Sequence, residues 1–374
     1  GGYPSKSGVM GNIGSAGGDD LVMETWGAML RRAGYRTGYF GKWHLGENAT
    51  ASAGWDEGFK QARDAEALAK GLAFIKQQAA GRQPFAVVIS IHNPHDVYDF
   101  KRDMGDLSGV SAELPVSWAK EEFLNKPPVQ KQFMTEDQGT AIWGQDQKVW
   151  EFYREYYRGK VKLYDDDLGQ VMQAMEANGL WDNTVFIATS DHGDMDTHHR
   201  LIFKGPFMYE HMVRIPLLIR VPKELGGAAP RTVTDYQGTN TDLAPTILDL
   251  AGIQPYACHG ESLKPLLTGA GGAPQRDYVA GQYYSKQKWV NPIRMIRTRE
   301  FKYNRYIRHG EELYDLKNDP HELVNLAGDP GYAERQRELS AELDRWIAAH
   351  EDPFSSLEST DREGGPLAIP GRSR

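Results

Sequence analysis

The sequence has almost no cysteine: Cys258 is the only one among 374 residues. A single cysteine excludes an internal disulfide framework and any metal site made of several thiolates. Basic residues are also in the minority, with 43 Lys and Arg against 51 Asp and Glu, and they form no block. A nucleic-acid-binding surface is therefore not expected. No apolar run approaches the ~18 residues of a membrane-spanning helix, so no span is expected either.

What the sequence does contain is an alternation of short apolar runs and amphipathic stretches over its first 270 residues. The apolar runs predict buried strands at 35–40, 85–91, 184–189 and 216–221. The amphipathic stretches predict helices at 20–33, 65–78, 159–175 and 242–250. This alternation predicts an α/β domain with a doubly wound, mostly parallel sheet and helices on both faces.

Two regions depart from that pattern. Residues 98–150 are irregular, and we interpret them as an insert over the active-site face rather than as a domain. After a Gly-rich linker, residues 271–374 predict a small α+β subdomain. Its expected antiparallel strands lie at 294–298 and 301–307, and its expected helix at 333–349. The predicted domains are thus 1–270 and 271–374.

A cluster of polar residues follows the strand predicted at 184–189. Asp191 and His192 lie at its carboxyl end, where open α/β sheets bind ligands. Lys204 lies on the loop that follows. A carboxylate, an imidazole and a lysine together indicate a metal-assisted site for an anion. From the short Asp-His-Gly triplet alone, a solvated loop with a capping Asp is an equal alternative.

Two more polar groups follow other predicted strands. Lys42 and His44 lie two residues apart between glycines, so an extended backbone would point both side chains the same way. Such a pair can hold an anionic oxygen and transfer a proton; the alternative is a solvated Lys beside a packed His. His92 and His95 follow the strand at 85–91. We favour a catalytic role for His95, and for His92 a capping or packing role with substrate contact as the alternative.

Several segments, in order along nearly the whole chain outside 98–150, resemble the signatures of the type I, formylglycine-dependent sulfatases of the alkaline-phosphatase-like superfamily. They are Gly38–Gly46 (GYFGKWHLG), Asn93–Asp96, Thr189–Gly193, Lys204 with Arg214–Pro216, Thr241–Thr246, and Glu312–Leu316 with Asn318–Pro320. The Gly-Lys-Trp-His element is specific to this family.

The resemblance implies roles for the polar residues. Asp191 and His192 would supply part of a site for one Ca²⁺ ion, although calcium generally prefers oxygen ligands. Lys42 and Lys204 would hold the sulfate oxygens. His95 would face the leaving-group oxygen as the general acid.

The resemblance also implies a nucleophile. His44 would act on a formylglycine made from the Cys or Ser of a Cys/Ser-x-Pro-x-Arg motif. That motif normally stands just before a Gly-x-Tyr-Pro stretch, which here is Gly1–Pro4. Cys258 lies in Ala-Cys-His-Gly and lacks the motif. We therefore expect the formylglycine, two further metal carboxylates and a central first strand to lie upstream of Gly1.

The implied function is hydrolysis of a sulfate ester, most often on a carbohydrate, through a covalent sulfo-enzyme adduct. A small aryl or alkyl sulfate remains open as substrate. The alternatives are a phosphonate monoester or phosphodiester hydrolase of the same superfamily and a non-catalytic binder of sulfated glycans. Substrate contacts are expected from the insert and from His198, His199 and Arg200. The family suggests a periplasmic or secreted protein, and the oligomeric state is not indicated.

Overall fold

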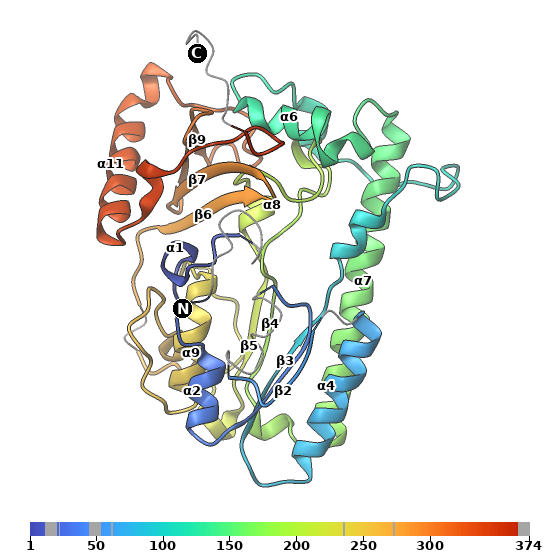
Figure 1. Ribbon diagram of the computed structural model, residues 1–374, viewed down its shortest axis with the longest axis vertical. Helices are drawn as coiled ribbons and strands as arrows, with labels where there is room; N and C mark the ends of the chain where they lie inside the picture. Colours follow the sequence, from blue (N-terminus) through green and yellow to red (C-terminus); the bar gives the residue numbers. More distant parts are fainter. Residues whose placement is uncertain are drawn as a thin grey trace.

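The computed structural model describes residues 1–11, 21, 23–44, 54–60, 63–234, 236–271 and 274–365, with the backbone alone at 59 and 60. Two sheet regions lie at opposite ends of its long axis (Figure 1). Strands β1–β5 form the core at one end, and a four-stranded sheet forms the other. The predicted α/β core and the separate antiparallel C-terminal sheet are both confirmed.

The core contains a parallel sheet and an antiparallel strand pair. The parallel sheet has the order β2-β1-β3, and the pair is β4-β5. The strands are β1 (Arg36–Gly41), β2 (Glu57–Lys60), β3 (Phe85–Ser90), β4 (Phe186–Thr189) and β5 (Leu217–Arg220). The apolar sequence of β3 predicts a fully buried strand, but all six of its residues are only partly buried. The reason is a cavity of about 1330 Å³, which both β3 and β4 line.

Helices cover both faces of the core, as predicted. One side carries α4 (Asp64–Ala79) and α7 (Gln147–Ala177), and the other carries α2 (Trp26–Arg32) and α9 (Leu243–Leu250) (Figure 1). The prediction for α2 began too early, because the Thr25 side chain accepts a hydrogen bond from the Ala28 amide and caps the helix there. Asp20 and Val22, within that prediction, lie outside the described residues. Among those residues, no helix has the length and apolar character needed to cross a membrane.

Helix α7 begins well before the predicted start at residue 159. Its first turns bury Val149, Trp150 and Tyr153, which the irregular composition around them concealed. These side chains pack in one cluster with the insert and the C-terminal sheet, including Phe133 and Ile293. The insert itself forms short helices, α5 (Val116–Lys120) and α6 (Pro128–Glu136). It therefore packs between the core and the C-terminal sheet; the domain boundary near residue 270 stays a prediction.

The C-terminal sheet is an antiparallel meander covered by a helix. Its strands, in spatial order, are β6 (Val279–Lys286), β7 (Trp289–Arg297), β8 (Phe301–Tyr306) and β9 (Glu311–Asp315). Helix α11 (Ala333–Ala349) packs on it through Leu339, Leu343 and Trp346. The two predicted strands and the helix are present. The sequence analysis missed β6, in which Gly, Ser and Gln interrupt the apolar positions.

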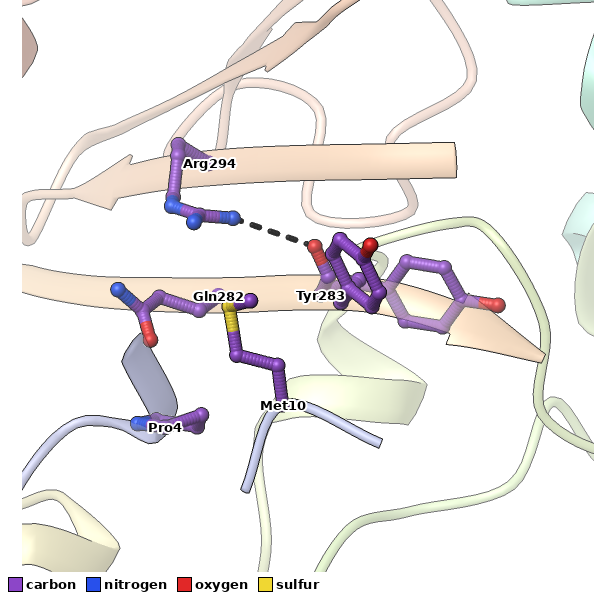
Figure 2. Close-up of a pocket in the computed structure, with 6 residues that line it drawn as sticks. Pro4, Met10, Gln282, Tyr283 and Arg294 are labelled. Atoms are coloured by element: carbon purple, nitrogen blue, oxygen red, sulfur yellow. Dashed lines mark hydrogen bonds between the residues drawn. The ribbon is translucent and has the colours of Figure 1, made fainter. Parts of the chain in front are cut away.

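The N-terminal segment is attached to this sheet. The Ser5 amide donates to Gln282 Oε1 at 3.2 Å, and the Tyr3 ring meets Trp346 edge-on with 4.8 Å between centroids. Figure 2 shows the small pocket where Pro4 and Met10 approach β6 and β7, with Arg294 donating to the Tyr283 carbonyl. The first residues of the chain therefore connect the core to the C-terminal sheet.

Candidate active site

The predicted site residues that follow β1, β3 and β4 meet at one cavity. The cavity lining includes Lys42, His44, His92, His95, Asp191, His192 and Lys204. They converge because each lies just past the carboxyl end of its strand, apart from Lys204, which the loop between β4 and β5 supplies. All four predicted catalytic residues and both predicted metal ligands therefore share one site.

The positive charges of the site lie close to its carboxylate. Lys42 Nζ is 3.5 Å from Asp191 Oδ2, and His192 Nε2 is 3.4 Å from the same oxygen. Lys204 Nζ lies 2.9 Å from His192 Nε2. The ammonium groups of Lys42 and Lys204 both lie on this cavity, which a second carboxylate, that of Asp194, also lines. Two ammonium groups on one cavity can together bind the oxygens of an anionic ligand.

The protonation of His192 follows from its hydrogen bonds. Its Nδ1 lies 2.7 Å from the Gly193 carbonyl oxygen, which can only accept, so Nδ1 carries the proton. Nε2 then has a free lone pair, which accepts from Lys204 here and could bind a cation. Burial lowers the pKa of His192, and the positive charge of Lys204 adds to this, so the ring is neutral.

Asp191 and Lys204 also have shifted pKa values. Burial opposes ionisation of Asp191, but His192, Lys42 and Lys204 together lower its pKa to about 2. Burial and the charge of Lys42 lower the pKa of Lys204 to about 8. At neutral pH the carboxylate is therefore ionised and the lysine is mostly charged.

Asp191 and His192 fit a partial metal site. One offers a carboxylate and the other an imidazole lone pair, and both line the cavity. The Asn240 amide group donates to the Asp191 carbonyl oxygen at 3.0 Å and holds this turn. Within the described parts of the chain, no group of three or more His, Cys, Asp or Glu could hold a metal ion. Calcium takes about six to eight ligands, so these two residues would supply only part of its shell.

His95 contacts two aromatic rings. It stacks on His92 with 4.4 Å between ring centroids, and the Tyr98 ring lies tilted against it at 4.7 Å. Burial, with the charges of Lys204 and Lys42, lowers the pKa of His95 to about 3. Burial and the same two lysines lower the pKa of His44. Both imidazoles are thus neutral at neutral pH.

Two glycines set the backbone of the site. Gly193 donates its amide to the Met212 carbonyl at 2.8 Å, and a Cβ there would lie 1.8 Å from the carbonyl oxygen of His211. Gly41 has φ +115°, and a Cβ there would lie 2.1 Å from the Ser90 carbonyl oxygen. No other residue type fits either position without moving backbone.

The structure does not bring His198, His199 or Arg200 into the cavity. His199 is fully buried, its Nδ1 is 2.9 Å from Glu121 Oε2, and its ring stacks on Tyr209 at 3.9 Å. A fully buried side chain cannot contact a substrate. The expectation for His199 is therefore corrected to a packing role.

The neighbours of His199 are also held by the insert. His198 Nδ1 lies 3.0 Å from Ser117 Oγ, and Arg200 Nε donates to the Trp118 carbonyl oxygen at 2.9 Å. The sequence could not reveal these contacts, because the partners lie about 80 positions away on α5. This loop therefore connects the site to the insert.

Sequence reasoning also missed residues that support the site. Tyr98 lies three positions after His95 in a 3₁₀ turn, a spacing that a helical reading of this segment could have revealed. Asn240 and Lys286 come from distant segments and left no local signal. Lys286 Nζ donates to the Lys204 carbonyl oxygen at 2.7 Å.

Comparisons with known proteins were made for the whole chain. A Sulfatase family model matches residues 1–253, and a model of the C-terminal region of N-sulphoglucosamine sulphohydrolase matches residues 198–349. The Delta 4,5-hexuronate-2-O-sulfatase of Bacteroides thetaiotaomicron is 29% identical over 357 residues, covering 89% of this chain and 73% of that protein.

Solved structures give the same picture. A 2-O GAG sulfatase superposes with a TM-score of 0.83 at 26% identity, over 96% of this chain and 81% of the other. The phosphonate monoester hydrolase of Agrobacterium radiobacter superposes with a TM-score of 0.69 at 21% identity, over 94% of this chain and 84% of the other. This second likeness concerns the fold alone.

Proposed function

This chain belongs to the sulfatase family, and from that premise we propose that it removes sulfate from a sulfated carbohydrate. Family membership makes it a sulfuric ester hydrolase. The observation that carries the proposal is the pair of lysines, Lys42 and Lys204, on the cavity that Asp191 and His192 also line. The carbohydrate is supported by the relatives that act on hexuronate and GAG sulfates.

We assign the two lysines to the sulfate group. A sulfate monoester carries one negative charge over three terminal oxygens. Cleavage of the sulfur–oxygen bond moves negative charge from the attacking oxygen toward the leaving oxygen, while the terminal sulfate oxygens remain negatively charged. Ammonium groups fixed beside those oxygens stabilise this redistribution without reorganising at the moment of reaction. Bound sulfate in turn favours the charged form of Lys204.

We assign His95 to the leaving group. A sugar alkoxide is a poor leaving group, so a proton must reach its oxygen as the bond breaks. Burial and the two lysines lower the pKa of His95 to about 3, so its ring is neutral at neutral pH. A sulfate held by those lysines offsets their charge and raises the proton affinity of His95. Bound substrate thereby favours the protonated form of His95.

Sulfatases generally depend on a formylglycine and a metal ion. The formylglycine would supply the nucleophilic hydroxyl, and a Ca²⁺ held partly by Asp191 and His192 would polarise the sulfate. His44 lies on the same cavity and would act as the base toward that hydroxyl.

Turnover by the product of the natural gene, made in a host that forms formylglycine, tests this proposal. We expect kcat/KM on 2-O-sulfated uronate or 6-O-sulfated glucosamine saccharides to exceed that on aryl sulfates and phosphodiesters. Peptide mapping would locate the formylglycine. Faster cleavage of phosphodiesters would favour the phosphonate monoester hydrolase alternative, which the fold likeness supports. Glycan binding without turnover would favour the non-catalytic alternative.

A further inference from the structure

Lys286 is the last residue of β6, yet its ammonium group reaches the core beside the active site. Its Nζ lies 2.7 Å from the Lys204 carbonyl oxygen and 3.2 Å from the Tyr98 hydroxyl. These partners are 82 and 188 positions away in the sequence. One side chain of the C-terminal sheet thus connects two separate loops of the core.

Both partners of Lys286 are next to residues assigned to the reaction. Lys204 is one of the two sulfate-binding lysines, and the Tyr98 ring lies 4.7 Å from that of His95. The Tyr98 ring also stacks on Phe203 with 4.1 Å between centroids. The Tyr98 ring is therefore one of the contacts that position the leaving-group acid. The hydrogen bond to the Lys204 carbonyl oxygen holds the backbone from which the Lys204 side chain extends.

The surroundings of Lys286 favour a long side chain that donates two hydrogen bonds. Its Nζ lies 5.2 Å from the centre of the Tyr98 ring and 4.9 Å from that of Phe133, within range of cation–π attraction. Both of its hydrogen-bond partners accept, so the group between them must donate twice. Burial lowers its pKa to about 7, while the charges of Asp137 and Asp194 favour the ammonium form.

We propose that Lys286 is a positioning residue for sulfate-ester cleavage, which holds in place the Lys204 backbone and the Tyr98 ring that contacts His95. It does not line the cavity and so acts through those groups. The proposal rests on the proposed function. Under this proposal, the geometry of the active site depends on a residue of the C-terminal sheet. Misplacement of reacting groups by about 1 Å can cost roughly 100-fold in rate.

The test uses three variants of the full-length enzyme. Lys286→Met removes both donors at similar length, Lys286→Arg restores them, and Lys288→Met is the control at an exposed position two residues along the same hairpin. We expect kcat on a sugar sulfate to fall about 10- to 100-fold in Lys286→Met. KM should change little, Lys286→Arg should recover part of the loss, and Lys288→Met should match wild type.

A leaving-group series separates positioning from general damage. Aryl sulfates with acidic phenols need little proton donation, whereas sugar sulfates need it fully. Loss of register at His95 should therefore slow sugar sulfates more than activated aryl sulfates. A merely destabilised enzyme would lose both equally. Such equal losses would overturn the proposal.

Tyr98→Phe keeps the inference testable if Lys286→Met does not fold. This change removes only the hydroxyl that Lys286 contacts and leaves the ring against His95. We expect a several-fold loss on sugar sulfates and a smaller loss on activated aryl sulfates, because only sugar sulfates need full proton donation. Wild-type rates in both variants would refute the positioning role and leave the sulfatase proposal intact. A wild-type enzyme without turnover on any sulfate ester would overturn both.

Discussion

Lys302 offers the sharpest test of how the C-terminal sheet is attached to the core. Its side chain is fully buried, with Nζ 3.2 Å from Glu210 Oε1 and in contact with Glu322. Glu210 begins α8 (Glu210–Val213) and also pairs with Arg297 at 2.9 Å. Burial opposes ionisation of Glu210, but hydrogen bonds from Arg297 and the charge of Lys302 lower its pKa to about 2. The two carboxylates and the two cationic side chains thus neutralise one another in a largely buried cluster.

Lys302→Met leaves one buried carboxylate without its cation. Breaking a buried pair in this way costs about 3–5 kcal/mol. A loss of that size corresponds to a melting temperature roughly 5–10 °C lower. The matched control is Lys317→Met, because Lys317 Nζ also lies 3.2 Å from a carboxylate, that of Glu300, with both side chains exposed. Exposed pairs contribute about 0–1 kcal/mol, so the control should barely change stability.

The loss should also depend on pH. Burial already raises the pKa of Glu322, and removing Lys302 would raise it further. A group whose pKa is higher in the folded state destabilises that state as pH rises through the folded pKa. The deficit should therefore be small near pH 4.5 and largest above neutrality. Thermal melts of both variants from pH 4.5 to 8 measure this. Equal losses for the two lysines, or a deficit independent of pH, would refute the reasoning.

The remaining predictions concern the site. Burial and Lys42 lower the pKa of Lys204 to about 8, so kcat/KM should fall above that pH. In a pH–rate profile, Lys204→Arg should remove this alkaline decline. Lys204→Ala should lower kcat/KM by about 100-fold or more. Gly193→Ala places a methyl group against the His211 carbonyl and should lower both melting temperature and activity. The control is Gly169→Ala within α7, where an added Cβ has no atom within 4 Å. This change should stabilise the folded protein by about 1 kcal/mol. Equal effects of the two substitutions would contradict the predicted clash at Gly193. Chelation should abolish turnover until Ca²⁺ is restored. The Asp191→Ala variant should need a higher Ca²⁺ concentration for its half-maximal rate. Turnover that is insensitive to a chelator would rule out the role of the metal.

Much of the site could be predicted because its residues follow strands directly. A short apolar run identifies a strand, and the polar residues after it lie where parallel strands place ligands. That local logic located Lys42, His95, Asp191 and His192 without any knowledge of pairing. It was weaker for Lys204, which a loop delivers, and there the family resemblance supplied the role.

The features that the sequence analysis predicted wrongly or did not predict have one physical cause. His199 has the same residue type as the site histidines, but only its contacts with Glu121 and Tyr209 show that it packs. The early start of α7 was missed because an irregular-looking segment gains its helix from burial of Trp150 and Tyr153. Side-chain burial depends on distant partners, which periodicity does not record.

The sequence by itself determined the strand and helix pattern of the core, the polar strand ends and the family, since all of these reside in short local segments. The tertiary structure alone decided which residues from distant segments contact one another. It brought Lys286 from β6 to Lys204 and Tyr98, and it placed Lys302 between Glu210 of α8 and Glu322. It also placed His198 and Arg200 against the insert. These contacts join residues tens to hundreds of positions apart, and their energies come from burial and charge pairing that exist only once the chain is folded.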